Sequence, residues 1–245
     1  MIDEKILAHA RQCAPAESCG YVIRTRQGAH YLPCKNRSIE PTKYFRMAPE
    51  DFLAAQAVGE VVALVHSHPD GEPYLSPADR QLQRASALPW WLVCDGKIHR
   101  FRCVPPLLGR QFEHGVMDCY TLFRDAYHLA GINLPDFQRD DDWWKQGRDL
   151  YQCNLPRYGF SQVSADMAQP GDIVLCCFGS SVANHAAIYC GDGVLLHHIP
   201  DQLSKRERYS DSWKRRTHSI WRHQAWSDSA FTGISNDLVS ASICM

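Results

Sequence analysis

The segment HSHPDGEPYLSPAD, residues 66–79, places two histidines, a serine and an aspartate at a spacing that can bind a metal. Residues two apart on a strand face the same side, so His66 and His68 converge if the apolar run before them is a strand. The turn PDGEPYL then reverses the chain, and Asp79 can supply a third, oxygen ligand. Three protein ligands leave a fourth tetrahedral position to water, which is typical of a catalytic zinc site. Zinc lowers the pKa of that water toward about 7.

The same residues also have a purely structural explanation. SPAD is a favourable helix start, with Ser76 as the N-cap, Pro77 in the first helical position and Asp79 at the third. A lone histidine is usually a hydrogen-bonded polar residue without further function. The four positions together nevertheless indicate a metal site, and Ser76 is then placed to donate a hydrogen bond to a developing oxyanion.

The pattern HxH, seven residues, Ser, two residues, Asp resembles the signature of the JAMM (MPN-type) zinc isopeptidases. The resemblance implies that His66, His68 and Asp79 bind zinc. It also implies that Ser76 is the oxyanion donor. That family has a glutamate before a strand as its general base, and Glu17 in PAESCGYVI matches this position. The mixed nitrogen and oxygen ligand set suits zinc but leaves iron and manganese open.

A second set of reactive residues lies in the other half of the chain. Cys119 falls in the first turn of a segment with helical spacing, DCYTLFRDAYHLAG, where free amide groups and the helix dipole should lower a thiol pKa. A thiolate beside a histidine is a useful nucleophile. His185 opens HAAIYC, and His197 follows twelve residues later across a GDG turn, so a hairpin makes them neighbours. We expect His197 to orient the ring of His185, as in a catalytic triad.

These residues have structural alternatives too. Asp118 can be only a helix N-cap. Cys119 is one of eleven cysteines, which should be reduced, with several in the core and at most one or two carrying chemistry. His198 faces the opposite side of its strand from His197 and is therefore the weaker partner. The absence of any CxxC pair argues against a zinc ribbon or a thioredoxin-type motif.

Residues 118–119 and the run HAAIYCGDGVLLH resemble the NlpC-type cysteine endopeptidases, a papain-like family that cleaves peptidoglycan stem peptides. The resemblance implies that Cys119 is the nucleophile, His185 its base and His197 the partner of that base. Two departures bear on substrate shape. Tyr and Thr follow the cysteine where the family has Ser and Gly, and Phe112 stands in place of the usual upstream tyrosine.

The order of strands and helices around these groups predicts two α+β domains, one in each half of the chain. Residues 1–103 should form a JAMM/MPN-like mixed sheet flanked by helices, with strands such as GYVIRT and VVALVH and a hairpin in PWWLVCDGKIHRFRC. Adjacent prolines mark residues 104–108 as a linker. Residues 109–223 should form the papain-like NlpC-type domain, with strands in DIVLCCF, HAAIYC and GVLLHHI. Residues 224–245, rich in Ser, Ala and Asn, are expected to be a loose C-terminal tail.

Composition and charge narrow the class of protein. A formal net charge of −1 argues against a nucleic-acid partner. Apolar runs such as IVLCCF fall far short of the roughly 20 residues that span a bilayer, and MIDEKILAHARQC does not read as a signal peptide, so we expect no membrane insertion and synthesis in a cytosol. Residues 204–223 hold seven Lys and Arg against two acids, which favours a solvated sheet edge over a surface for an acidic partner.

The combination of both domains in one chain resembles the tail tip assembly proteins of lambda-like phages. It implies synthesis in the host cytoplasm, a place in the virion tail tip, and action at the host periplasm and cell wall. Other tail tip proteins would be its partners and peptidoglycan stem peptides its substrate. Two functions remain open. The chain is either a working hydrolase, whose zinc domain cuts an isopeptide or amide bond, or an assembly factor whose sites act only in maturation or are dispensable.

Overall fold

The computed structural model describes residues 1–242, and the chain divides into two compact units, Met1–Val104 and Pro105–Met245. Each unit combines one β-sheet with helices, which confirms the predicted α+β class in both halves. No helix among residues 1–242 is long and apolar enough to cross a membrane.

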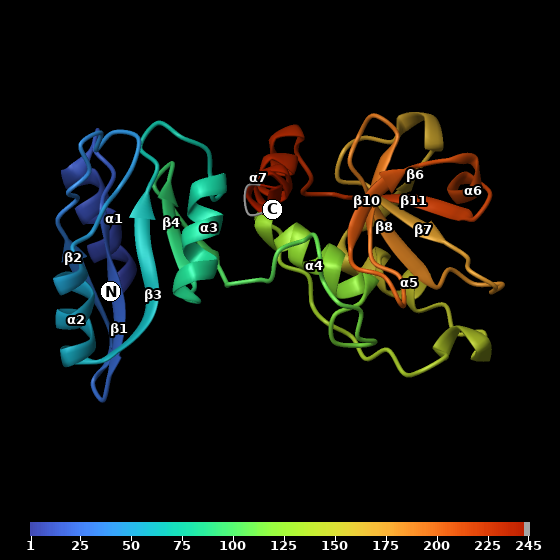
Figure 1. The fold of residues 1–245 in the computed structure, drawn as a ribbon, viewed down its shortest axis with the longest axis horizontal. Helices are drawn as coiled ribbons and strands as arrows, with labels where there is room; N and C mark the ends of the chain where they lie inside the picture. Colours follow the sequence, from blue (N-terminus) through green and yellow to red (C-terminus); the bar gives the residue numbers. More distant parts are fainter. Residues whose placement is uncertain (243–245) are drawn as a thin grey trace. The chain divides into compact units, whose positions relative to one another are not determined.

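The first unit contains a five-stranded sheet in the order β2-β1-β3-β4-β5 (Figure 1). Neighbouring strands are antiparallel except β3 and β4, which run parallel. The elements are α1 (Ile2–Cys13), β1 (Cys19–Thr25), β2 (Gly28–Cys34), α2 (Pro49–Val58), β3 (Glu60–Ser67), α3 (Pro77–Ser86), β4 (Trp90–Cys94) and β5 (Lys97–Phe101).

Both faces of this sheet are covered, because apolar side chains alternate along its strands. Val22 of β1 packs in one core with Ile6 of α1. Tyr21 and Ile23 face the other way and pack in a second core with Ala55 of α2. The metal-ligand candidates lie at the end of β3, on the side of this second core.

Helix α3 is fixed at both of its ends. Ser76 caps its start, and the buried Gln83 donates through Nε2 to the carbonyl oxygen of Phe101 at 3.0 Å. The guanidinium of Arg80 donates to the carbonyl oxygen of Val104 at 3.0 Å. The first turn of the helix is therefore held against the sheet, where Asp79 must lie to meet the two histidines.

The second unit contains a six-stranded sheet in the order β10-β9-β8-β7-β11-β6, antiparallel throughout. Helix α4 packs against β8, which brings the start of the helix toward the first residue of that strand. The elements are α4 (Cys119–Leu129), η1 (Trp143–Gln146), α5 (Leu150–Asn154), η2 (Pro156–Tyr158), β6 (Phe160–Val163), η3 (Ala165–Met167), β7 (Ile173–Cys176), β8 (His185–Tyr189), β9 (Val194–His197), β10 (Lys205–Arg208), α6 (Asp211–Lys214), β11 (Thr217–His223), η4 (Asp228–Ala230) and α7 (Phe231–Ser242).

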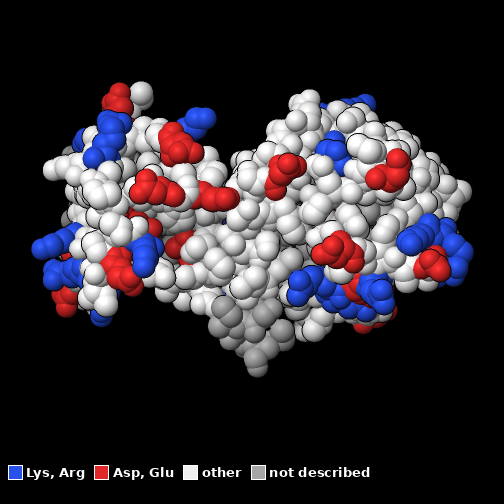
Figure 2. All heavy atoms as spheres, turned by 90° about the horizontal axis from the view of Figure 1, so that it is seen from above, with Lys and Arg blue, Asp and Glu red and all other residues white. Residues whose placement is uncertain are grey.

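Three strands of this sheet escaped prediction, namely β6, β10 and β11. Each is short or rich in polar residues, so no apolar run marks it in the sequence. The basic stretch predicted as a solvated edge includes β10, which lies at the edge of the sheet. Figure 2 shows that basic and acidic atoms lie beside each other on the surface of both units, in keeping with the small net charge.

The expected loose tail is wrong, because helix α7 occupies Phe231–Ser242 and packs against α4. A Cβ on Gly233 would lie 2.0 Å from the carbonyl oxygen of Leu129, so the helices meet at a distance that glycine permits. Ile234 and Leu238 are buried. Asp237 accepts a hydrogen bond from the amide of Leu107 at 2.8 Å, which fastens the proline segment to this unit. The surrounding Ser and Asn masked this apolar spacing, and residues 243–245 of the expected tail lie outside the described residues.

Candidate active sites

The first candidate site lies where β3 ends. His66 is on the strand, and His68 follows it, with its amide bound to the carbonyl oxygen of Val93 at 2.9 Å. The two Nε2 atoms are 3.1 Å apart. Asp79 Oδ2 lies 3.5 Å from Nε2 of His66 and 3.3 Å from Nε2 of His68. The structure thus brings together the three residues predicted as metal ligands.

These three donors fit a zinc ion. Bonds of about 2.0–2.1 Å in a tetrahedral site separate the ligand atoms by about 3.3 Å, close to the three observed distances. Nδ1 of His68 lies 3.0 Å from the carbonyl oxygen of Glu72, which places the ring proton on Nδ1 and leaves the Nε2 lone pair for a metal. The donors are two imidazoles and one carboxylate, a set that zinc accepts.

Burial and mutual contact set the charges of this cluster. Burial alone would raise the pKa of Asp79, but the adjacent rings of His66 and His68 hold that pKa well below its usual range. Burial lowers the pKa of His66, although Asp79 opposes the shift. At neutral pH the cluster therefore offers a carboxylate and a neutral imidazole, the forms that bind metal ions.

The two other residues predicted for this site lie close to it. Glu17 directly precedes Ser18 and β1, whose residue Cys19 pairs with His66 across the sheet. Burial raises the pKa of Glu17 to about 7, although His68 opposes the shift. Ser76 Oγ accepts a hydrogen bond from the amide of Asp79 at 3.1 Å, and its hydroxyl proton remains available for donation. The base and oxyanion roles of these two residues stay predictions.

The second candidate site is a pocket of about 630 Å³ in the second unit. Asp118 caps α4 by accepting from the amide of Thr121 at 3.0 Å, so Cys119 is the first helical residue. Cys119 and His185, the residues predicted as nucleophile and base, both line this pocket. Its walls also include Phe112, His114, Arg139, Asp141, Trp143, Trp144, Tyr151, Phe178, Asn184, Ile199 and Pro200.

The expected lowering of the cysteine pKa is wrong. Burial, together with the Asp118 carboxylate, raises the pKa of the Cys119 thiol to about 11. Burial likewise lowers the pKa of His185 to about 3. The loss of hydration at the buried thiol outweighs the helix terminus, so the resting pair is a neutral thiol and a neutral imidazole.

Tyr151 is a site residue that the sequence did not reveal. Its hydroxyl lies 3.2 Å from Sγ of Cys119, and its ring is buried in α5. No motif surrounds it, and the contact spans 32 positions of the chain. Phe112, the expected replacement for a tyrosine, lines the pocket and packs edge-to-face with His198, with ring centroids 5.1 Å apart.

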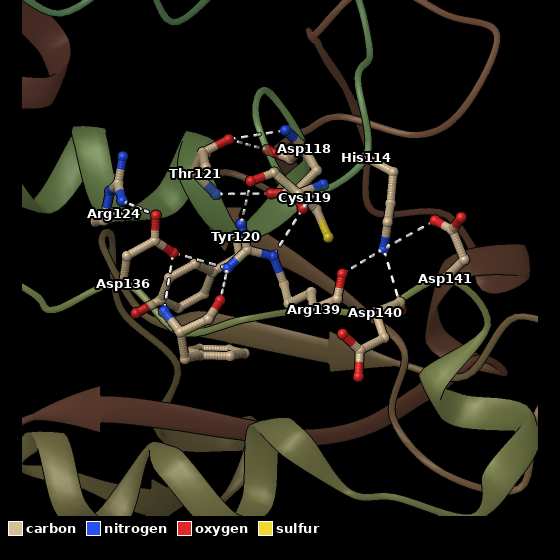
Figure 3. A network of polar contacts seen from close by, with 12 residues as sticks. His114, Asp118, Cys119, Tyr120, Thr121, Arg124, Asp136, Arg139, Asp140 and Asp141 are labelled. Carbon is tan, nitrogen blue, oxygen red and sulfur yellow. Dashed lines mark hydrogen bonds and ion pairs between the residues drawn. The ribbon is translucent and has the colours of Figure 1, made fainter.

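A buried ion pair supports the start of α4 (Figure 3). Nε of Arg139 lies 2.8 Å from Oδ2 of Asp118, and both side chains are 2% exposed. The same guanidinium binds Asp136 at 2.8 Å and the carbonyl oxygens of Phe137 and Gly115. Asp118 is therefore held from two sides, by its helix and by a loop about 20 residues away along the chain. No local sequence pattern marks this pair.

His197 lies beside His185, because β9 and β8 are neighbours. Their ring centroids are 6.0 Å apart and the rings are nearly perpendicular, at 76°. Within residues 1–242, Nε2 of His185 has no hydrogen-bond partner, and neither ring nitrogen of His197 has one. The structure thus places the predicted partner next to the base, while the expected hydrogen bond between the rings is not formed. On the far side of His197 lies Glu207, which the sequence analysis did not single out.

Comparison with known proteins matches each half of the chain to a different family. Residues 2–104 match the family model described as prokaryotic homologs of the JAB domain, and residues 109–222 match the NlpC/P60 family. The chain is 72% identical over 196 residues to tail tip assembly protein K of Escherichia phage lambda, a match that covers 80% of this chain and 98% of that protein. The chain belongs to the family of phage tail tip assembly protein K.

A second member, tail tip assembly protein K of Escherichia phage N15, is 36% identical over 228 residues, which cover 90% of this chain and 93% of that protein. A desampylase of Haloferax volcanii is 35% identical over 115 residues, covering 39% of this chain and 78% of that protein. A solved NlpC/P60 family protein from Bacillus cereus has a TM-score of 0.37 at 12% identity, covering 87% of this chain, and the chain spans 65% of its length.

Proposed function

We propose that this chain is a phage tail tip protein with two peptidase sites. Its second unit is a Cys-His-His endopeptidase that cleaves peptidoglycan stem peptides during host entry. Its first unit is a zinc-dependent hydrolase of an isopeptide or amide bond. The observation that carries the proposal is the single pocket shared by Cys119 and His185, with His197 directly behind the base.

The neutral resting state of the pair defines how the thiol is used. As Sγ of Cys119 attacks a peptide carbonyl carbon, its proton passes to His185, which later returns a proton to the leaving amine. The hydroxyl of Tyr151 keeps the sulfur in place at 3.2 Å. Proton transfer to His185 is thus coupled to attack, since a thiol with a pKa of about 11 is not ionised beforehand at neutral pH.

In the first unit, His66, His68 and Asp79 are the residues that would hold zinc. A bound zinc ion would supply Lewis acidity and a water of lowered pKa. Glu17, with a pKa of about 7, can take up a proton near neutral pH and return it. The Ser76 hydroxyl can donate to an oxygen that becomes negatively charged. The match to a protein named desampylase supports a hydrolytic role in this chain.

The proposed setting follows from the family. The relatives are named tail tip assembly proteins, which supports other tail tip proteins as partners and the virion tail tip as the final location. Synthesis in the host cytoplasm and action at the periplasm and cell wall are part of the proposal. The NlpC/P60 family match supports a substrate from peptidoglycan.

The endopeptidase is tested with Gram-negative peptidoglycan fragments and mass spectrometry of the products. We expect the wild-type chain to cut stem peptides and Cys119→Ala to leave them intact. Cys153→Ala is the matched control, because Cys153 is an exposed free cysteine of the same unit and should not affect cleavage. Intact fragments with folded wild-type protein would contradict the assignment.

The metal centre is tested without any substrate. After dialysis against zinc and removal of free metal, we expect about one zinc per wild-type chain and a large loss in His68→Ala, because three donors form the site. His30→Ala, on β2 away from the cluster, should retain the metal. Equal zinc content in all three proteins would show that these donors do not form the site.

A second candidate function is that of an assembly factor whose sites act only in maturation, and the name of the relatives favours it. The two functions separate in phage produced with Cys119→Ala. Complete tails that fail to infect would place the peptidase at host entry. Failure to form tails would place it in assembly, and fully infectious phage would make the cysteine site dispensable.

A further inference from the structure

His197 has a carboxylate on the side away from His185. In the β9–β10 ladder, His197 pairs with Lys205, so Glu207, two residues further along β10, lies on the same face of the sheet. Oε2 of Glu207 is 3.3 Å from Nε2 of His197, whose side chain is 1% exposed. The contact is within ion-pair distance, and Nε2 of His197 has no hydrogen-bond partner among residues 1–242, so Glu207 is the acceptor placed nearest to it.

The Glu207 carboxylate is itself fixed. The indole N–H of Trp213 donates to Oε1, and Nζ of Lys205 lies 2.9 Å from Oε2. Burial would raise the pKa of Glu207, but these two donors lower it to about 2, so the group is an anion at neutral pH. The ring of Trp213 also packs on His197, with centroids 4.6 Å apart.

An anionic carboxylate only accepts hydrogen bonds, and this constrains the imidazole beside it. His197 must carry its proton on Nε2 to bind Glu207, which leaves the lone pair on Nδ1. Nε2 of His185 is buried and has no hydrogen-bond partner within residues 1–242. An N–H at that atom would match the acceptor on His197. The lone pair of His185 would then be on Nδ1, the ring nitrogen left to take the proton of Cys119.

We propose that Glu207 is a positioning residue that sets the tautomer of His197 and, through it, that of His185. The proposed order of action is Cys119, His185, His197, Glu207. This inference rests on the proposed endopeptidase, because it concerns the base of the same site. No proton leaves or enters Glu207 during the reaction. Its negative charge stabilises the positive charge that spreads over the two imidazoles when His185 accepts the thiol proton.

Two variants remove the Glu207 carboxylate to different extents. Glu207→Ala removes the acceptor altogether. Glu207→Gln keeps one oxygen, which cannot accept from both His197 and Trp213, so its effect should be intermediate. Arg206→Gln is the control, since Arg206 is an exposed neighbour on the same strand. Circular dichroism checks that all three proteins are folded.

The decisive readout is the tautomer, which a merely structural residue would not change. Long-range ¹H–¹⁵N NMR of the imidazoles, assigned through single histidine variants, should show wild-type His197 protonated on Nε2. Glu207→Ala should shift His197 to a mixture that includes the Nδ1–H form, and Arg206→Gln should match the wild type. An unchanged His197 tautomer in Glu207→Ala would overturn the proposal.

The rate at which Cys119 is alkylated is a second readout, and it can be measured without a substrate. Iodoacetamide is added at pH 7, and peptide mass spectrometry follows alkylation of Cys119, with the exposed Cys153 as internal reference. In Glu207→Ala we expect Cys119 to react about tenfold more slowly, by analogy with the loss of about 10–100-fold when the outer hydrogen-bond partner of a metal-binding imidazole is removed. Equal rates in Glu207→Ala and the wild type would count against the proposal.

The outcomes also separate this inference from the proposed function. One possible result is that Glu207→Ala changes the tautomer and the alkylation rate while the wild-type protein leaves peptidoglycan intact. That result would support Glu207 as the positioning residue and contradict the substrate assignment. Cleavage of peptidoglycan by both the wild type and Glu207→Ala at the same kcat would support the endopeptidase and overturn the role of Glu207.

Discussion

The substitution Arg139→Met should destabilise the second unit strongly. Arg139 and Asp118 are both 2% exposed and lie 2.8 Å apart, so the change leaves a buried carboxylate without its counter-charge. Removing one partner of such a pair costs about 3–5 kcal/mol. Asp118 keeps the amides of Gly115 and Thr121 as donors, and methionine preserves packing on the Tyr120 ring, which places the expected loss in the free energy of unfolding at about 3–4 kcal/mol.

A matched control comes from the same loop. Arg148 pairs with Asp140 at 2.9 Å, but these side chains are 44% and 46% exposed, so Arg148→Met should cost much less stability than Arg139→Met. The double variant Arg139→Met/Asp118→Asn removes both buried charges, and asparagine is still a good N-cap. It should therefore be more stable than Arg139→Met alone.

These stability differences are measured by urea unfolding, monitored by hydrogen–deuterium exchange mass spectrometry. Peptides from residues 105–242 report the unfolding of the second unit separately from that of residues 1–104. The reasoning fails if Arg139→Met costs no more than Arg148→Met. It also fails if the double variant is less stable than Arg139→Met, because the ion pair would then not be the origin of the loss. The same samples allow a second check, in which Cys119 should be alkylated more slowly in Arg139→Met, since Arg139 lowers the pKa of that thiol.

Two further predictions concern the second unit. Ile234→Ala in α7 should lower its free energy of unfolding by about 2–5 kcal/mol, whereas the exposed Val239→Ala should change it by under about 0.5 kcal/mol, and equal urea midpoints would contradict the packing of this helix. Acidification should destabilise the unit, because unfolded His185 takes up a proton near pH 6.5 while the folded residue, with a pKa of about 3, does not. Stability from this group is present above pH 6.5 and is lost toward pH 3, by at most about 1.4 kcal/mol per pH unit. Urea unfolding at pH 7 and pH 5 should therefore show a smaller drop for His185→Asn than for the wild type.

Motifs with fixed spacing allowed much of the candidate chemistry to be predicted. HxH on a strand forces two rings to the same side, and SPAD sets both a helix cap and the position of Asp79, so local geometry alone brings these groups near each other. The α+β class and many of the strands and helices followed from apolar periodicity in the same way, whereas β6, β10, β11 and α7 did not. A hairpin of fixed length likewise made His185 and His197 neighbours before any tertiary contact was known.

Contacts between distant segments were beyond the reach of the sequence. Tyr151 meets Cys119, Arg139 meets Asp118, and Glu207 meets His197 through pairings of loops or edge strands that no local pattern marks. The Ser- and Asn-rich composition of the tail also led to a wrong prediction, because it obscured the apolar spacing of α7.

The sequence by itself determined which residue types could do chemistry and which of them local geometry brings side by side. Only the tertiary structure decided how deeply those groups are buried and what lies behind them. Burial depends on the packing of the whole unit, and it reverses the expected state of Cys119 from thiolate to neutral thiol. The position of Glu207, the anion that stabilises the histidine pair, likewise depends on tertiary structure, because it follows from the pairing of β10 with β9.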